Sequence, residues 1–104
     1  MVTGALGNVG GYVAKHLIQD GQDVAVADIN VDALRDRYGD QAESVLFDFM
    51  DSSTFATALQ NVDRVFIMRP PHLGKPEDLK PFVEALRQKG DIKLVSFLDR
   101  KSVV

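Results

Sequence analysis

Short apolar runs alternate with longer segments of helical period along this chain. Two runs, 24–27 and 65–68, contain no polar residue, which is typical of strands covered on both faces of a parallel sheet. Further strands are expected at 1–3, 44–47 and 92–98. Between them the apolar positions recur at helical spacing, as in Leu79, Phe82, Val83 and Leu86. This pattern predicts four helices, at 9–20, 31–38, 52–62 and 79–89.

Capping residues support these helix boundaries. Asn30 is the expected N-cap of the second helix, and Asp51 or Ser52 that of the third. An N-cap at Asp78 would place Pro81 in the first turn of the fourth helix, where proline is tolerated. Glycines follow three of the helices as expected C-caps: Gly21, Gly39 and Gly90. The resulting β-α-β-α-β-α-β-α-β order predicts an α/β fold, a doubly wound parallel five-stranded sheet with right-handed crossovers.

The connection between the first strand and the first helix is rich in glycine. It reads G-x-x-G-x-x-G, with glycines at 4, 7 and 10. Such glycines permit a tight turn, a close approach of backbone to a pyrophosphate, and close helix–sheet packing. The positive end of the following helix then faces the phosphates. No Lys-Ser/Thr pair follows, so the segment is not a Walker A loop. A dinucleotide site is predicted; a purely conformational turn is the alternative.

An acidic residue stands at the end of the second predicted strand. Asp28 follows 24–27 and lies eighteen positions after Gly10. A carboxylate there can accept hydrogen bonds from the adenosine ribose and repels a 2′-phosphate, which favours NAD over NADP. The alternative is that Asp28 caps the next helix or is solvated in the loop.

Composition narrows the class of protein. The chain has 104 residues, one domain by length, and a net charge of -3, which argues against a nucleic-acid partner. It has no cysteine, so a disulfide framework, a thiolate metal site and a cysteine nucleophile are excluded. Asp48 and Asp51 could form a carboxylate pair for a metal, but helix capping by Asp51 is the commoner reason for such a residue, so we expect no metal site. No signal peptide or membrane span is evident, so a cytoplasmic location is expected.

The segment 3–10, T-G-A-L-G-N-V-G, resembles the T-G-A-x-G-x-x-G opening of the extended and atypical short-chain dehydrogenases. Within them, the stretch 61–71, N-V-D-R-V-F-I-M-R-P-P, is similar to the G-V-D-x-V-F-L-x-x-P-P of the NmrA-like branch. That branch includes NAD(P)-binding redox sensors, quinone oxidoreductases and sugar-epimerase-like proteins. The resemblance spans 1 to about 98, and Asp48 matches the family's strand-end residue that contacts adenine.

The resemblance implies a Rossmann-like domain over 1–104 with strand order 3-2-1-4-5. It also implies a cofactor site, with NAD as the preferred dinucleotide. The residues implied for that site are Gly4, Gly7, Asn8, Val9, Gly10, Asp28, Ile29, Asp48, Phe49, Met68 and Arg69.

The chain departs from the family after its fifth strand. Family members continue with a substrate region, and no Tyr-x-x-x-Lys pair occurs here, so no catalytic residue is assigned. His72 is expected to be an exposed loop residue. We expect a truncated NAD(P)-binding domain of oxidoreductase ancestry, incomplete for catalysis alone; a non-catalytic redox sensor with a protein partner and a remnant without ligand are the alternatives. An uncovered strand edge predicts self-association, with no membrane partner.

Overall fold

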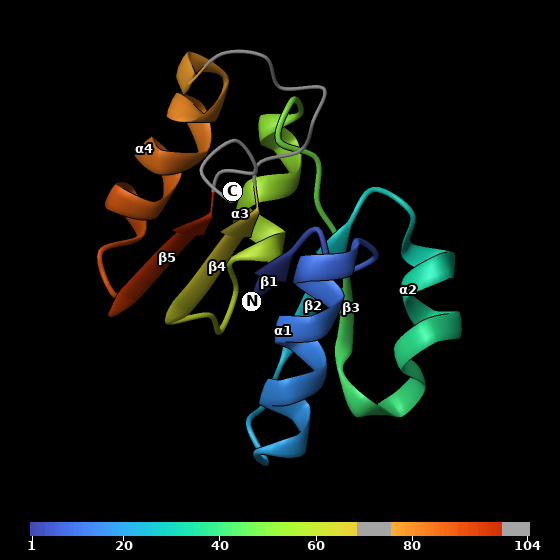
Figure 1. Cartoon of the computed structure of the whole chain (residues 1–104). Coiled ribbons are helices and arrows are strands. Elements are labelled where there is room, and N and C mark those ends of the chain that lie inside the picture. The colour runs from blue at the N-terminus through green and yellow to red at the C-terminus, as the bar shows by residue number, and fades with distance from the viewer. Residues whose placement is uncertain (69–75, 99–104) are drawn as a thin grey trace.

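The computed structural model describes residues 1–68 and 76–98, which form one sheet with helices on both faces (Figure 1). The elements in chain order are β1 (Val2–Thr3), α1 (Asn8–Gln19), β2 (Ala25–Asp28), α2 (Val31–Tyr38), β3 (Glu43–Leu46), α3 (Phe55–Ala58), β4 (Arg64–Met68), α4 (Lys80–Lys89) and β5 (Leu94–Leu98). Short 3-10 turns occupy Gly39–Gln41, Ser52–Thr54 and Pro76–Leu79. Both the fold class and the alternation predicted from the sequence are confirmed.

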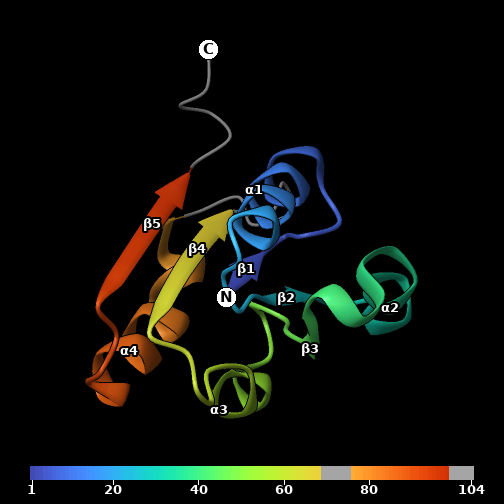
Figure 2. The ribbon, with the colours of Figure 1, turned by 90° about the horizontal axis from the view of Figure 1, so that it is seen from below.

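The sheet is parallel throughout and has the order β3-β2-β1-β4-β5, as expected. Figures 1 and 2 show α1 and α2 on one face and α3 and α4 on the other. All five strands therefore end at the same edge of the sheet, and the connections that follow β1, β2 and β3 meet there. The reversal of strand order lies at β1, which is the position where open α/β sheets bind ligands.

The central strand is the shortest. Val2 pairs with Val26 of β2 on one side and with Phe66 of β4 on the other. Beyond these pairs, the Phe66 N–H donates to the Met1 carbonyl at 2.8 Å. The two halves of the sheet are therefore held together by very few residues.

Each face of the sheet has its own core. Under α3 and α4, four aromatic rings pack together, and Phe47 lies with its centroid 4.8 Å from that of the fully buried Phe82. Under α1 and α2, the core is mainly aliphatic, with Val26 and Leu34, and it also contains the ring of Tyr38. Alternate residues of a strand point to opposite faces, so Val26 and Ala27 belong to different cores.

The helix ends agree with the capping predictions for α2 but differ at the starts of α3 and α4. The predicted cap Asp51 begins the 3-10 turn Ser52–Thr54, and α3 itself starts after Thr54. The Asn30 side chain accepts a hydrogen bond from the Ala33 N–H at 3.0 Å, and Gly39 and Gly90 follow α2 and α4. The prediction that Asp78 caps α4 is wrong. A 3-10 turn over Pro76–Leu79 leads into the helix, so its cap is Leu79, although Pro81 still lies in the first turn. None of the helices described is long and apolar enough to cross a membrane.

Candidate functional site

The glycine-rich turn leaves β1 at the centre of the strand-end edge. Gly4 has a φ of +65°, a conformation that side chains rarely adopt, and a Cβ there would lie 3.3 Å from the Cβ of Met68. Gly10 is in the first turn of α1, where a Cβ would overlap the Gly4 carbonyl and lie 2.7 Å from its carbon. The backbone of α1 therefore rests directly on the end of β1. Two of the three predicted glycine roles, the turn and the close packing, are visible in these distances.

The N-terminus of α1 faces this turn without a side-chain cap. Gly7 is the N-cap residue and has an ordinary extended backbone, with φ of -80°. Its carbonyl accepts from the Gly11 N–H at 2.9 Å. Within residues 1–68 and 76–98, no acceptor bonds the amides of Asn8, Val9 and Gly10. Such an N-terminus carries a partial positive charge and donors that suit an anion.

Thr3 was not among the predicted site residues, yet it sets the position of the turn. Its side chain is fully buried, and its Oγ1 accepts from the Met68 N–H at 2.9 Å and donates to the Phe66 carbonyl at 3.2 Å. The Thr3 hydroxyl thus adds side-chain hydrogen bonds to the single backbone pair of β1 and β4, Val2 with Phe66. A polar residue at the end of a buried strand is the sequence signal that could have indicated this role.

Asp28 ends β2, next to the glycine-rich turn in the sheet. Its Oδ1 accepts from the backbone N–H of Ile29 at 2.7 Å and more weakly from that of Asn30 at 3.5 Å. Its Oδ2 has no partner among the described residues. The alternative considered from the sequence, local capping, is therefore present for one oxygen, and the other oxygen is available to a ligand. Ile29 beside it is exposed.

Asp48 and Phe49 follow β3 at the same edge but have different surroundings. The Asp48 side chain is half-buried, and its Oδ1 accepts from the Met50 N–H at 2.9 Å. Phe49 is buried in the aromatic core, with its ring centroid 4.7 Å from that of Phe47. Its ring is therefore occupied by packing, and only its backbone is placed to contact a cofactor. The structure adds this limit to the sequence prediction.

The remaining predicted residues are at the end of β4 or follow it in the sequence. Met68 ends β4, is half-buried and lies beside Gly4. Arg69 and His72 lie outside the described residues. No group of three or more His, Cys, Asp or Glu side chains that could hold a metal ion occurs in the part of the chain that the structure describes. Asp51, considered with Asp48 as a carboxylate pair, instead accepts hydrogen bonds from the N–H and Oγ of Ser53.

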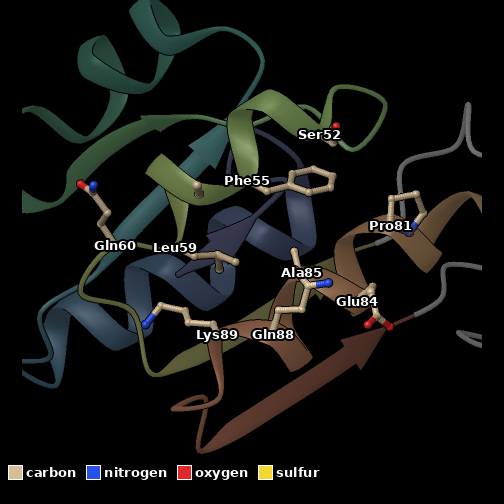
Figure 3. A pocket seen from close by; sticks show the side chains of 10 residues that line it. Ser52, Phe55, Leu59, Gln60, Pro81, Glu84, Ala85, Gln88 and Lys89 are labelled. Carbon is tan, nitrogen blue, oxygen red and sulfur yellow. The ribbon is translucent and has the colours of Figure 1, made fainter.

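A pocket lies away from this edge, between α3 and α4 (Figure 3). It has a volume of about 760 Å³, and its walls include Phe55, Leu59, Pro81 and Ala85. Glu84 and Lys89 at its rim are engaged in ion pairs with Arg87 and Asp91. The sheet separates it from α1, so it forms no part of the glycine-rich site.

Comparison with known proteins was made by sequence and by structure. No family model matches the chain. The chain is 33% identical to prestalk A differentiation protein A of Dictyostelium discoideum over 109 aligned residues, which cover 99% of this chain and 36% of that protein. It is 30% identical to the uncharacterized oxidoreductase YesF of Bacillus subtilis (strain 168) over 96 residues, or 91% of this chain and 32% of that protein. The chain thus spans about a third of the length of these relatives.

Solved structures with the same fold include a reductase, a quinone oxidoreductase and a sugar epimerase. Isoflavone reductase has a TM-score of 0.73 at 20% identity, over 89% of this chain and 33% of its own. The NADPH-dependent quinone oxidoreductase QOR2 of Escherichia coli, complexed with NADPH, has a TM-score of 0.75 at 17% identity, over 91% of this chain and 34% of its own. A nucleoside-diphosphate-sugar epimerase of Staphylococcus aureus has a TM-score of 0.76 at 20% identity, over 91% of this chain and 35% of its own. These likenesses confirm the Rossmann fold, and they are to the kinds of protein that the family resemblance indicated.

Proposed function

We propose that residues 1–104 form one NAD(P)-binding domain of an oxidoreductase, with NAD preferred to NADP, that does not complete a reaction by itself. The premise is that this chain has the Rossmann fold of reductases, quinone oxidoreductases and sugar epimerases. The observation that carries the proposal is the contact of Gly10 with Gly4. It brings the uncapped amides of α1 over the end of β1, where a pyrophosphate would be bound.

The residues of the turn fit such a group. The first amides of α1 are unbonded among the described residues, Gly7 is exposed, and its missing side chain leaves room for a phosphate above the turn. We assign the cofactor contacts to the edge formed by the ends of β1, β2, β3 and β4: Gly4, Gly7, Asn8, Val9, Gly10, Asp28, Ile29, Asp48, Phe49 through its backbone, Met68 and Arg69. When bound, a nicotinamide dinucleotide supplies hydride transfer.

The preference for NAD rests on Asp28. Its Oδ1 is held by the Ile29 amide, which fixes the carboxylate at the end of β2, and its Oδ2 remains for a ribose hydroxyl. A fixed negative charge there disfavours the 2′-phosphate of NADP by Coulomb repulsion.

Calorimetric titration of the chain with NADH and with NADPH tests this function. We expect NADH to bind more tightly, and Asp28→Asn to weaken NADH by about tenfold while NADPH is unaffected or improved. Asp23→Asn is the matched control, since Asp23 is exposed and precedes β2 at the opposite edge of the sheet. Absence of binding for both dinucleotides would overturn the proposal. Equal weakening of both by Asp28→Asn would overturn only the preference for NAD.

The incomplete reaction has its own assay. We expect no oxidation of bound NADH when a quinone is added to this chain, because no catalytic residue is assigned in it. Turnover with quinone would contradict this part and identify the chain as an enzyme. Self-association through β5 is also part of the proposal, since Leu94 and Val95 are exposed on this end strand of the described sheet.

A further inference from the structure

The last turn of α2 contacts the glycine-rich turn through two side chains. The hydroxyl of Tyr38 donates to the Ala5 carbonyl at 2.6 Å in a buried position. The Arg37 Nη1 donates to the carbonyl of Leu6 at 2.9 Å. These contacts join residues that are 33 and 31 positions apart. Two consecutive side chains of one helix therefore hold two consecutive carbonyls of the turn.

The direction of these carbonyls matters for an anion. A trans peptide has its C=O and the next N–H pointing in opposite directions, and residues 1–68, which include this turn, contain no cis peptide. The Ala5 carbonyl is held toward Tyr38, so the Leu6 N–H points away from it. Among the described residues no acceptor bonds that N–H. Holding both oxygens toward α2 also keeps their negative ends away from a phosphate, while successive N–H groups favour one.

The turn has little internal support of its own. Across 4–7, its single backbone hydrogen bond in the described structure runs from the Gly7 N–H to the Gly4 carbonyl, at 2.9 Å. Gly7 supplies no capping side chain to the helix that follows. The orientation of the Ala5–Leu6 and Leu6–Gly7 peptides therefore depends on Arg37 and Tyr38.

Gly11 leaves the space that the Arg37 guanidinium occupies. It is not one of the three spaced glycines, and the motif offers no reason for it. A Cβ at Gly11 would lie 2.5 Å from the Arg37 Nη2 and 3.1 Å from its Cζ. The guanidinium thus lies over the first turns of α1, and its Cζ is also 5.7 Å from the centre of the Tyr38 ring. The absence of a side chain at Gly11 allows Arg37 to reach Leu6.

We propose that Arg37 and Tyr38 are positioning residues of the dinucleotide site, which fix the peptides of the phosphate-binding turn from behind. Gly11 belongs to the same device, since it accommodates the guanidinium. Neither side chain needs to touch the cofactor for this role. The inference rests on the proposed function for its ligand, but the ordering of the turn is a property of the chain without cofactor.

Two measurements test the inference with four single variants: Arg37→Met, Tyr38→Phe, Gly11→Ala and, as a control, Arg35→Met. Arg35 is on the same helix and exposed, and its ion pair with Asp32 has no link to the turn. Amide hydrogen exchange by NMR at Gly7, whose N–H donates to the Gly4 carbonyl, reports the order of the turn without cofactor. Calorimetry with NADH reports the affinity of the site.

We expect Arg37→Met and Tyr38→Phe to speed exchange at Gly7 and to weaken NADH binding about three- to tenfold. Arg35→Met should change neither. Gly11→Ala should reproduce Arg37→Met, because its Cβ displaces the flexible end of Arg37. The double variant Gly11→Ala/Arg37→Met should then bind no more weakly than Arg37→Met alone.

The outcomes separate this inference from the proposed function. Unchanged exchange at the turn in both Arg37→Met and Tyr38→Phe would overturn the inference, whatever the affinity. Weaker binding in Arg37→Met with unchanged exchange would show instead that its charge acts on the cofactor directly. If the unmodified chain does not bind NADH but the two variants loosen the turn, the proposed function fails and the positioning of the turn stands.

Discussion

Gly7 and Gly10 lie three residues apart in one turn, but the structure gives them different reasons to be glycine. A Cβ at Gly10 would overlap the backbone of Gly4, which cannot move without displacing β1. A Cβ at Gly7 would meet one atom, the Gly4 oxygen, at 3.3 Å, and its backbone conformation suits any residue. Packing therefore requires glycine at position 10, whereas at position 7 the fold makes no such demand and the proposed phosphate contact is the reason for glycine.

Alanine at each position separates these roles. We expect Gly10→Ala to lower the free energy of unfolding by about 1–3 kcal/mol through overpacking. Gly7→Ala should change it by less than about 1 kcal/mol and should mainly weaken NADH binding. Urea denaturation followed by circular dichroism, with calorimetry on the folded variants, measures both. A Gly7→Ala variant as unstable as Gly10→Ala would contradict this division.

Tyr38 provides a pH signature of the same turn. Burial raises the pKa of Tyr38 above its ordinary value of 10.0, and the neighbouring Arg37 acts in the opposite sense. The unfolded chain therefore loses this proton more readily than the folded one. The stability that the protonated phenol contributes is fully present below pH 10.0 and is lost as the pH rises through the folded-state pKa.

Tyr38→Phe removes both the hydrogen bond and this titration. We expect it to lower the free energy of unfolding at neutral pH by about 1–2 kcal/mol, because the Ala5 carbonyl loses its partner. The Tm difference from the unmodified chain should then shrink above pH 10.0. Thermal melts of both proteins from pH ~7 to ~11 measure this. A constant difference across that range would count against a buried, protonated phenol.

At the scale of the elements, a carboxylate caps the 3-10 turn Ser52–Thr54 that leads into α3. Asp51 accepts hydrogen bonds from the Ser53 hydroxyl at 2.6 Å and from its N–H at 3.0 Å. These bonds hold the pKa of Asp51 below its ordinary value of 3.8. The stabilisation is therefore present above pH 3.8 and is lost as the pH falls through the folded-state pKa.

Ser53→Ala tests this cap by its acid dependence. We expect the variant to have a lower Tm at neutral pH, and the deficit to shrink as the pH falls through the folded-state pKa of Asp51. Ser52→Ala is the control, since the Asp51 carboxylate bonds Ser53 and not Ser52. A deficit that stays the same in acid would mean that the serine acts by some means other than this carboxylate.

The elements were predictable because their signals are local. Apolar runs, helical spacing, Asn30 and the C-terminal glycines each report on a few neighbouring residues, and α/β alternation then leaves few topologies. The misplaced cap at Asp78 shows the limit of such signals, since a 3-10 turn and a cap look alike in sequence. Tyr38 lies in a helix that the sequence predicts, but its bond to Ala5 is a long-range contact that no local pattern contains.

At the scale of the whole molecule, β5 is an end strand of the described sheet and carries exposed apolar side chains. Leu94 and Val95 of β5 are 55% and 45% exposed, and β5 has one strand neighbour in the described sheet. An open, apolar edge favours pairing between copies of the chain. Self-association is therefore expected to rise with concentration.

Light scattering at increasing concentration tests this expectation. Leu94→Lys should shift the mass toward that of the monomer, because a charge on an edge strand opposes pairing. Met50→Lys is the control: Met50 is 64% exposed but follows β3 at the other end of the sheet. A monomeric mass for the unmodified chain at high concentration would contradict the expectation.

The brevity of β1 has a thermodynamic consequence. The two halves of the sheet, β3-β2 and β4-β5, pair through a two-residue strand, β1, which the Thr3 hydroxyl reinforces. The core beneath α3 and α4 also joins them, since it contains Ala27 of β2 together with Val65 and Ile67 of β4. The glycine-rich turn begins directly at the end of β1, so a ligand bound there would stabilise the folded state by its own binding free energy. Ligand binding and folding are then coupled, so the free energy of unfolding rises as the site is occupied.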